Sequence, residues 1–109
     1  MTTHRIAELA FPDDFDPQFR WRSIRARVLA RRGEFEEAER LAREAVEIVD
    51  STDWHLQRGE AAQAVGEVLE LAGRTDEARA AYERAVESFE RKGAAPDAEA
   101  VRRRLEVLP

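Results

Sequence analysis

The sequence predicts an all-α fold made of two antiparallel helix hairpins and a C-terminal capping helix. The first observation is composition: charged residues make up 38% of the chain, with many alanines, leucines, glutamates and arginines, which is typical of helices. The second is an internal repeat, because Arg-Gly-Glu-Phe-Glu-Glu-Ala at 32–38 returns as Ala-Gly-Arg-Thr-Asp-Glu-Ala at 72–78. The third is that apolar residues recur at helical spacing within each copy. A fixed period of about 20–50 residues indicates an array of helical units.

The first repeat is predicted to cover residues 17–50. Its first helix, 17–32, has Asp16 as a good N-cap, and Pro17 suits the first helical position because its missing N–H needs no partner there. Gly33 ends this helix in a left-handed conformation. The apolar stripe that the spacing predicts as its buried face is Trp21, Ile24 and Val28, with Leu29 beside it.

The second helix of this repeat is predicted over 35–49. Its apolar residues recur at helical spacing, and small alanines at the facing positions should let the two helices approach closely. The polar segment 50–53 ends this helix and is expected to cap the next one. The residues expected at the helix–helix contact are Phe35, Ala38, Ala42, Ala45 and Val49.

The second repeat, 54–92, is predicted to contain helices over 54–72 and 76–92. Gly73 closes the first of these helices, and Thr75 is expected to cap the second. Short links after Gly33 and Gly73 favour antiparallel pairs. A capping helix over 97–107 then completes a helical domain of residues 17–109, with Ala98, Val101, Leu105 and Leu108 facing inward.

Residues 1–16 are assigned to an N-terminal extension. Ile6, Leu9 and Phe11 are expected to form one short helical turn that packs on the first hairpin. The segment Phe11-Pro12-Asp13-Asp14 has the composition of a turn.

Composition also limits the function. The chain has no cysteine, so neither disulfides nor thiolate metal sites are available. No apolar run approaches the roughly 20 residues of a membrane span, and the N-terminus lacks the apolar stretch of a signal peptide. We therefore expect a cytoplasmic protein without a membrane partner. The formal net charge of −5 argues against nucleic acid as the main partner.

No residue set predicts catalysis, a cofactor or a metal ion. His4 and His55 are the only histidines, and neither has a second ligand at metal spacing. No glycine-rich phosphate loop or nucleophile elbow occurs, so we predict that the chain is not an enzyme. A cluster of carboxylates at the start of the second helix is explained by the favourable charge at a helix N-terminus; its members are Glu34, Glu36, Glu37 and Glu39.

The repeated residues resemble the tetratricopeptide repeat family. Gly-x-Phe-x-x-Ala at 33–38, followed by Ala42 and Ala45, is similar to the second helix of such a repeat. The usual unit of this family has about 34 residues, whereas this one has 40, and the six extra residues fall at the start of the third helix. The second copy carries the family's small and aromatic positions at Gly66, Leu69, Gly73, Ala78, Tyr82 and Ala85.

Longer phrases at 28–39, 68–78 and 89–93 resemble the C-terminal repeats of large bacterial ATPase- or cyclase-linked transcription regulators. The resemblance covers about residues 17–107. It implies a protein–protein interaction module that binds a peptide or a partner protein in bacterial signalling or regulation. No nucleotide-binding or cyclase segment is present, so no activity carries over with the resemblance.

The resemblance also implies where such a partner binds, because first-in-pair helices line the inner curve of this fold. Arg20, Arg27 and Arg31 share one face of the first helix, and one period later Glu60, Glu67 and Leu71 occupy the matching positions. The expected partner-binding groove is therefore Arg20, Arg27, Arg31, Glu60 and Glu67.

Two other readings of these charges stay open. They can pair with one another across neighbouring helices, or the arginines of the first helix, together with Arg102, Arg103 and Arg104, can form a nucleic-acid surface. Phe19 and Trp21 flank Arg20, but no aromatic residue stands next to Arg27, Arg31 or residues 102–104 to stack on bases, which argues against nucleic acid. So short an array forms only a shallow groove, so we expect weak binding by a monomer or pairing with a second copy of the chain.

Overall fold

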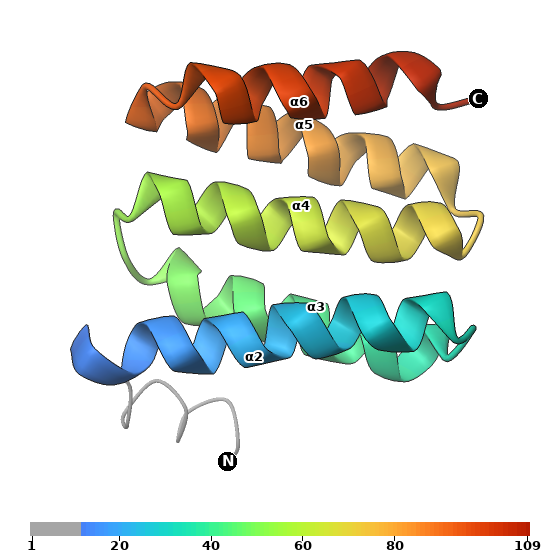
Figure 1. The fold of residues 1–109 in the computed structure, drawn as a ribbon, viewed down its shortest axis with the longest axis horizontal. Helices are drawn as coiled ribbons and strands as arrows, with labels where there is room; N and C mark the ends of the chain where they lie inside the picture. Colours follow the sequence, from blue (N-terminus) through green and yellow to red (C-terminus); the bar gives the residue numbers. More distant parts are fainter. Residues whose placement is uncertain (1–11) are drawn as a thin grey trace.

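Five α-helices make up residues 12–109, the part of the chain that this computed structural model describes. They are α2 (Pro12–Arg31), α3 (Phe35–Asp50), α4 (His55–Leu71), α5 (Thr75–Lys92) and α6 (Ala95–Val107). Helices α2, α4 and α6 lie side by side in one layer, and α3 and α5 form a second layer behind them (Figure 1). No strand occurs among the described residues, so the predicted all-α fold of two hairpins and a capping helix is confirmed.

Three glycines end helices, and for Gly33 and Gly73 this confirms the prediction from the sequence. Gly33, Gly73 and Gly93 have φ angles of 82°, 79° and 81°, in the left-handed region that side chains disfavour. After each of the three helices, the glycine N–H and the next N–H bond back to carbonyls of the last turn. In the first case, Gly33 N–H bonds Ala30 O at 3.0 Å and Glu34 N–H bonds Leu29 O at 2.9 Å. The tight reversal after Gly33 and Gly73 makes the paired helices antiparallel.

Small residues line the contacts between the helices. The predicted alanines are fully buried, which lets the backbones of neighbouring helices come close. This prediction is confirmed for Ala38, Ala42, Ala45, Ala78 and Ala85.

The two hairpins fill one equivalent contact in opposite ways. In the second hairpin, Phe89 of α5 lies against Gly59 of α4, where an added Cβ would be 2.6 Å from the ring. Forty residues earlier the pair is Phe19 and Val49, which share a buried cluster. The aromatic ring therefore comes from the first helix in one hairpin and from the second helix in the other.

The first helix begins earlier than predicted. Helix α2 starts at Pro12 rather than at residue 17, so Asp16 does not cap it and Pro17 lies inside it. The turn predicted at 11–14 is wrong over residues 12–14, which are helical. Pro12 itself has the fixed φ that suits a first helical position, and the two aspartates after it are favoured in a first turn. The turn predicted around Ile6, Leu9 and Phe11 lies outside the described residues.

The predicted buried face of this helix is also wrong. Trp21, Ile24 and Val28 are exposed, to 46%, 58% and 38% of their surface. Their period is helical, but the period alone does not say which face meets a neighbour. The residues that α2 buries against its neighbours are Phe19, Arg22, Ser23, Ala26, Leu29 and Ala30.

Arg22 is the unexpected member of that face. Its Nε donates to Glu44 Oε1 of α3 at 3.0 Å, and its Nη1 donates to Gln18 Oε1 at 2.8 Å. The guanidinium also lies 4.5 Å from the centre of the Trp21 ring. A charge can be buried when it is paired and hydrogen-bonded, which explains how an arginine occupies a core position.

Two predicted helix caps do not form. Thr75 is the first residue of α5, and the cap position is Arg74, whose side chain makes no capping bond. The cap position of α4 is likewise Trp54, without a side-chain cap, although Thr52 Oγ1 accepts the Trp54 N–H at 3.1 Å. Helix α4 starts at His55, as predicted, but its 17 residues do not make it longer than α2 with 20 or α5 with 18.

Candidate partner-binding face

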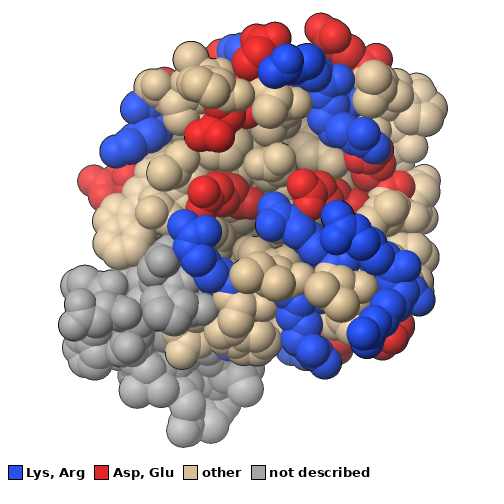
Figure 2. Space-filling model, viewed as in Figure 1, with Lys and Arg blue, Asp and Glu red and all other residues tan. Residues whose placement is uncertain are grey.

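Arginines of α2 pair with glutamates of α4 at equivalent positions of the two repeats. Arg27 Nε lies 2.5 Å from Glu67 Oε1, exactly one 40-residue period away in sequence. Arg20 Nη2 lies 3.4 Å from Glu60 Oε1, again one period later. The two helices thus form two rungs of a ladder of charges, seen as a blue row beside a red row in Figure 2. The reading in which these charges pair across neighbouring helices therefore describes Arg20, Arg27, Glu60 and Glu67.

The third rung of this ladder is different. Arg31 stands one turn after Arg27, and its counterpart one period later is Leu71 instead of a glutamate. Arg31 is exposed and makes no ion pair with the side chains of residues 18–109. Leu71 is 51% exposed. A cation and an apolar side chain thus stand together where the pattern of opposite charges stops.

A pocket of about 360 Å³ opens beside this rung. Helix α2 contributes Arg27 and Arg31, α4 contributes Glu67 and Leu71, and the floor includes Tyr82 of α5. Arg104 of α6 lies on the far side. The pocket therefore spans all three helices of the front layer, which we call the α2–α4–α6 face.

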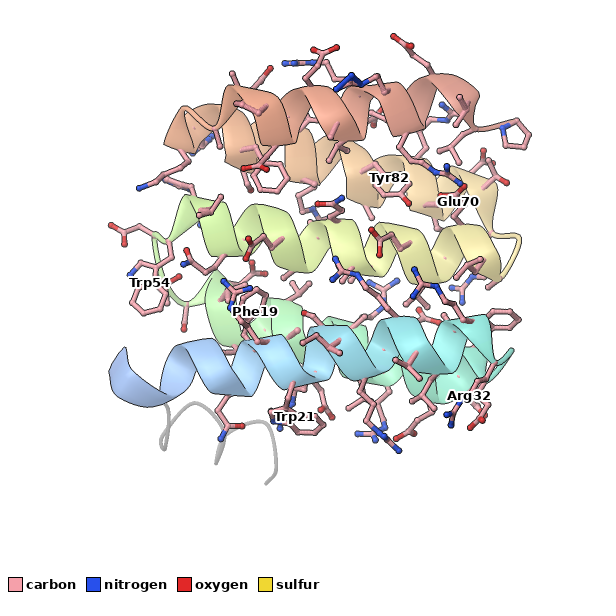
Figure 3. All side chains as sticks on the ribbon, viewed as in Figure 1. Phe19, Trp21, Arg32, Trp54, Glu70 and Tyr82 are labelled. Carbon is pink, nitrogen blue, oxygen red and sulfur yellow. The ribbon has the colours of Figure 1, made fainter. Side chains whose placement is uncertain are left out.

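A buried tyrosine and an ion pair fix the far wall of the pocket. Tyr82 Oη donates to Glu70 Oε1 at 2.8 Å, and Arg104 Nε donates to the same oxygen at 2.9 Å. Tyr82 of α5 and Glu70 of α4 lie close together in Figure 3, and Arg104 comes from α6. The hydrogen bonds from Arg104 and then Tyr82 lower the pKa of the Glu70 carboxyl. Burial, followed by the bond to Glu70, raises the pKa of Tyr82.

The sequence did not reveal this wall. Tyr82 stands out in the sequence only as an aromatic position of the family, and its ring is buried, but the residue also lines the pocket. Glu70 and Arg104 are 34 residues apart, so the 40-residue period does not relate them. The only available signal was that both lie on first-in-pair helices, which the fold places in one layer.

The described residues offer no other obvious chemistry. Among the side chains of residues 18–109, no group of three or more histidine, cysteine or acidic residues lies together as a metal site would need. Within the same residues, no helix combines the length and the apolar character of a membrane span.

The comparisons with known proteins agree with this architecture. A family model described as tetratricopeptide repeat matches residues 20–91, about two thirds of the chain. The matched range runs from α2 to α5 and so includes both hairpins. No curated protein and no solved structure matches the sequence.

Proposed function

The chain belongs to the tetratricopeptide repeat family, and on that premise we propose that it binds a peptide or a partner protein on its α2–α4–α6 face. Members of this family generally mediate protein–protein interactions and are typically non-catalytic. A repeat array presents one continuous surface built from equivalent positions of successive units. The question for this chain is which part of that surface can receive a ligand.

The unpaired third rung is the observation that carries this proposal. Arg20 and Arg27 already have carboxylate partners, so a ligand that binds them must compete with Glu60 or Glu67. Arg31 has no such competitor in the described structure, and the exposed Leu71 lies beside the pocket. Binding energy is concentrated where a ligand desolvates apolar surface and finds charge partners not already satisfied.

The side chains of Arg31 and Leu71 define the chemistry of the expected ligand. We expect a segment that carries an acidic side chain for Arg31 and, close to it, an apolar side chain for the pocket at Leu71. Arg27 would join the contact if the carboxylate draws it from Glu67, since both side chains are about one third exposed. Two hairpins offer a small surface, so we expect weak binding by a monomer, strengthened where a second copy extends the surface.

Selection from a random peptide library displayed on phage tests the proposal. The wild-type protein should enrich sequences in which an acidic residue stands near an apolar one. The variant Arg27→Glu with Arg31→Glu should lose these peptides, because it replaces the attractive charge by a repulsive one. A matched control, Arg84→Glu with Arg91→Glu, makes the same change in net charge on exposed positions of α5 and should bind as the wild type does.

Retention of the peptides by the Arg27→Glu, Arg31→Glu variant would show that this face is not the site. Nucleic acid, the alternative, is tested with a labelled DNA duplex and a single-stranded RNA. Binding through phosphates weakens steeply as salt rises, and tight, salt-sensitive binding to either probe would favour that alternative. The pairing of Arg20 and Arg27 with carboxylates supports the peptide instead, because paired arginines release little binding energy to phosphate.

We also propose a bacterial regulatory setting inside the cytoplasm, which rests on the phrases shared with large transcription regulators. The observation that tests it is the neighbourhood of the gene and the extent of its transcript. A reading frame that continues into an ATPase or cyclase segment, or a neighbouring regulator gene, would support this setting. A neighbourhood of secreted or envelope proteins would contradict it.

A further inference from the structure

Helix α2 carries an apolar stripe that the side chains of residues 18–109 leave largely exposed. Trp21, Ile24 and Val28 follow one another at helical spacing and are 46%, 58% and 38% exposed. Trp21 lies on the side of α2 that is away from α4 (Figure 3). We call these three residues the N-terminal stripe.

The equivalent positions in the second repeat indicate the role of this stripe. One period later, the same positions are Ala61, Ala64 and Val68, and each is almost completely buried. They are buried because α4 packs against the hairpin that precedes it, α2 and α3. Ala61, for example, lies in one buried cluster with Ile48 and Val49 of α3. The N-terminal stripe therefore occupies the face on which a first-in-pair helix receives the helix before it.

The outer face at the C-terminal end of the molecule has a different composition. Helix α4 receives α5 through Gly59 and Gly66, each in contact with an aromatic ring. The positions one period later, on α6, are Glu99 and Glu106, which are both exposed. A polar outer face is what terminal units of a repeat array need for solubility. The C-terminal end thus has such a face, whereas α2 presents apolar residues at the other end.

We propose that residues 4–10 of the same chain cover the N-terminal stripe, chiefly through Ile6 and Leu9. These residues precede α2 in the chain as α3 precedes α4. One period before Val46 and Val49 of α3 stand Ile6 and Leu9. Val49 is buried in the cluster that contains Ala61, and Val46 packs against that cluster, so the equivalent contacts bring Ile6 and Leu9 toward Trp21.

The size of the stripe favours this occupant over a second copy of the chain. Three part-exposed apolar side chains offer on the order of 300 Å², whereas a stable complex buries about 800 Å² on each partner. A covalently tethered segment needs far less, because its effective concentration is high. Arg25 is exposed between Trp21 and Val28, so symmetric pairing of two such faces would bring like charges together.

The fluorescence of Trp21 tests the proposal. The chain has two tryptophans, so Trp54→Phe leaves Trp21 as the only indole. In this background we expect emission at the short wavelengths of a covered indole and weak quenching by acrylamide. Changing Ile6→Asp and Leu9→Asp should shift the emission to longer wavelength and increase quenching. Circular dichroism should show that the helices are retained.

The matched control carries Thr3→Asp and Ala7→Asp. These positions correspond to Arg43 and Glu47, which are exposed on α3, so the control should leave Trp21 unchanged. The proposal is overturned if Trp21 is already fully quenchable before substitution, or if both double variants act alike. It is also overturned if the emission depends on protein concentration, because a second copy would then be the occupant.

A disulfide trap gives an independent reading. The chain has no cysteine, so Ile6→Cys with Trp21→Cys introduces a single possible pair. Mild oxidation should produce a cross-linked monomer, which has increased mobility on a non-reducing gel. Cross-linked dimers in its place, or a pair that stays reduced, would contradict the proposal.

Discussion

Gly66 of α4 lies directly against the ring of Tyr82 of α5: a Cβ added to this glycine would be 2.6 Å from two ring carbons. The ring is itself almost completely buried, so it has little room to move. The second hairpin therefore closes over a residue that has no side chain. The same relationship holds between Gly59 and Phe89.

Gly66→Ala is expected to destabilise the fold by about 1–3 kcal/mol, the usual cost of forcing atoms into a packed contact. This is opposite to the gain of about 1 kcal/mol that alanine brings in an unobstructed helix. Urea denaturation measures the difference. In the second contact, the double variant Gly59→Ala, Phe89→Leu should lose less stability than the sum of the losses measured for the two single variants. A more stable Gly66→Ala protein would show that α4 and α5 are further apart.

Ala85→Leu should also cost about 1–3 kcal/mol, because Ala85 is fully buried at the helix contact. The thermal unfolding midpoint should fall accordingly. Ala80→Leu is the control, since Ala80 is exposed on the same helix and its substitution should leave the midpoint nearly unchanged. Equal midpoints for the two variants would place a different face of α5 against the core.

The Arg27–Glu67 pair is expected to contribute at most about 1 kcal/mol to stability, as pairs this accessible to solvent do. A double-mutant cycle with Arg27→Ala and Glu67→Ala measures the coupling. A small value means that loss of peptide binding in the charge-reversed variant reflects the site and not the fold. A coupling of several kcal/mol would instead make the pair a structural element, and the peptide experiment would then need a gentler substitution at Arg31.

Tyr82 should make stability depend on alkaline pH. Its pKa is raised, first by burial and then by its bond to Glu70, so the neutral form is favoured in the folded state. Its contribution is therefore complete below the unfolded pKa of about 10 and is lost as pH rises through the folded value. Tyr82 is the only tyrosine, so ultraviolet absorbance follows it alone. Tyrosinate should appear near pH 10 in denaturant and only at higher pH in the native protein; equal titrations would contradict the buried hydroxyl.

Local signals predicted most of the fold. The glycines that end helices and the alanines at helix contacts depend on short-range geometry, and both are found as predicted. The first helix was harder, because Trp21, Ile24 and Val28 have the spacing of a buried face. Which face is buried depends on the neighbouring element, and a period carries no such information. A search for apolar periodicity also passes over Arg22, whose burial rests on Glu44 and Gln18.

The candidate site was only partly predictable. The period of 40 residues aligns Arg20 with Glu60 and Arg27 with Glu67, and the distances show that they pair. Glu70 and Arg104 follow no such period, because α6 is not placed on α4 as α4 is placed on α2. Their contact depends on the path of the chain through α5, which only the tertiary structure reveals.

The exchange of ring and small residue between the hairpins restricts how this array can be recombined. Replacing α2 by α4 in the first hairpin would oppose Gly59 to Val49 and leave a hole, whereas replacing α4 by α2 in the second hairpin would force Phe19 against Phe89. Single helices are therefore not exchangeable parts, although the repeat makes them look so. Duplication, deletion or grafting that keeps the core filled must move a whole hairpin, with its joints in the loops.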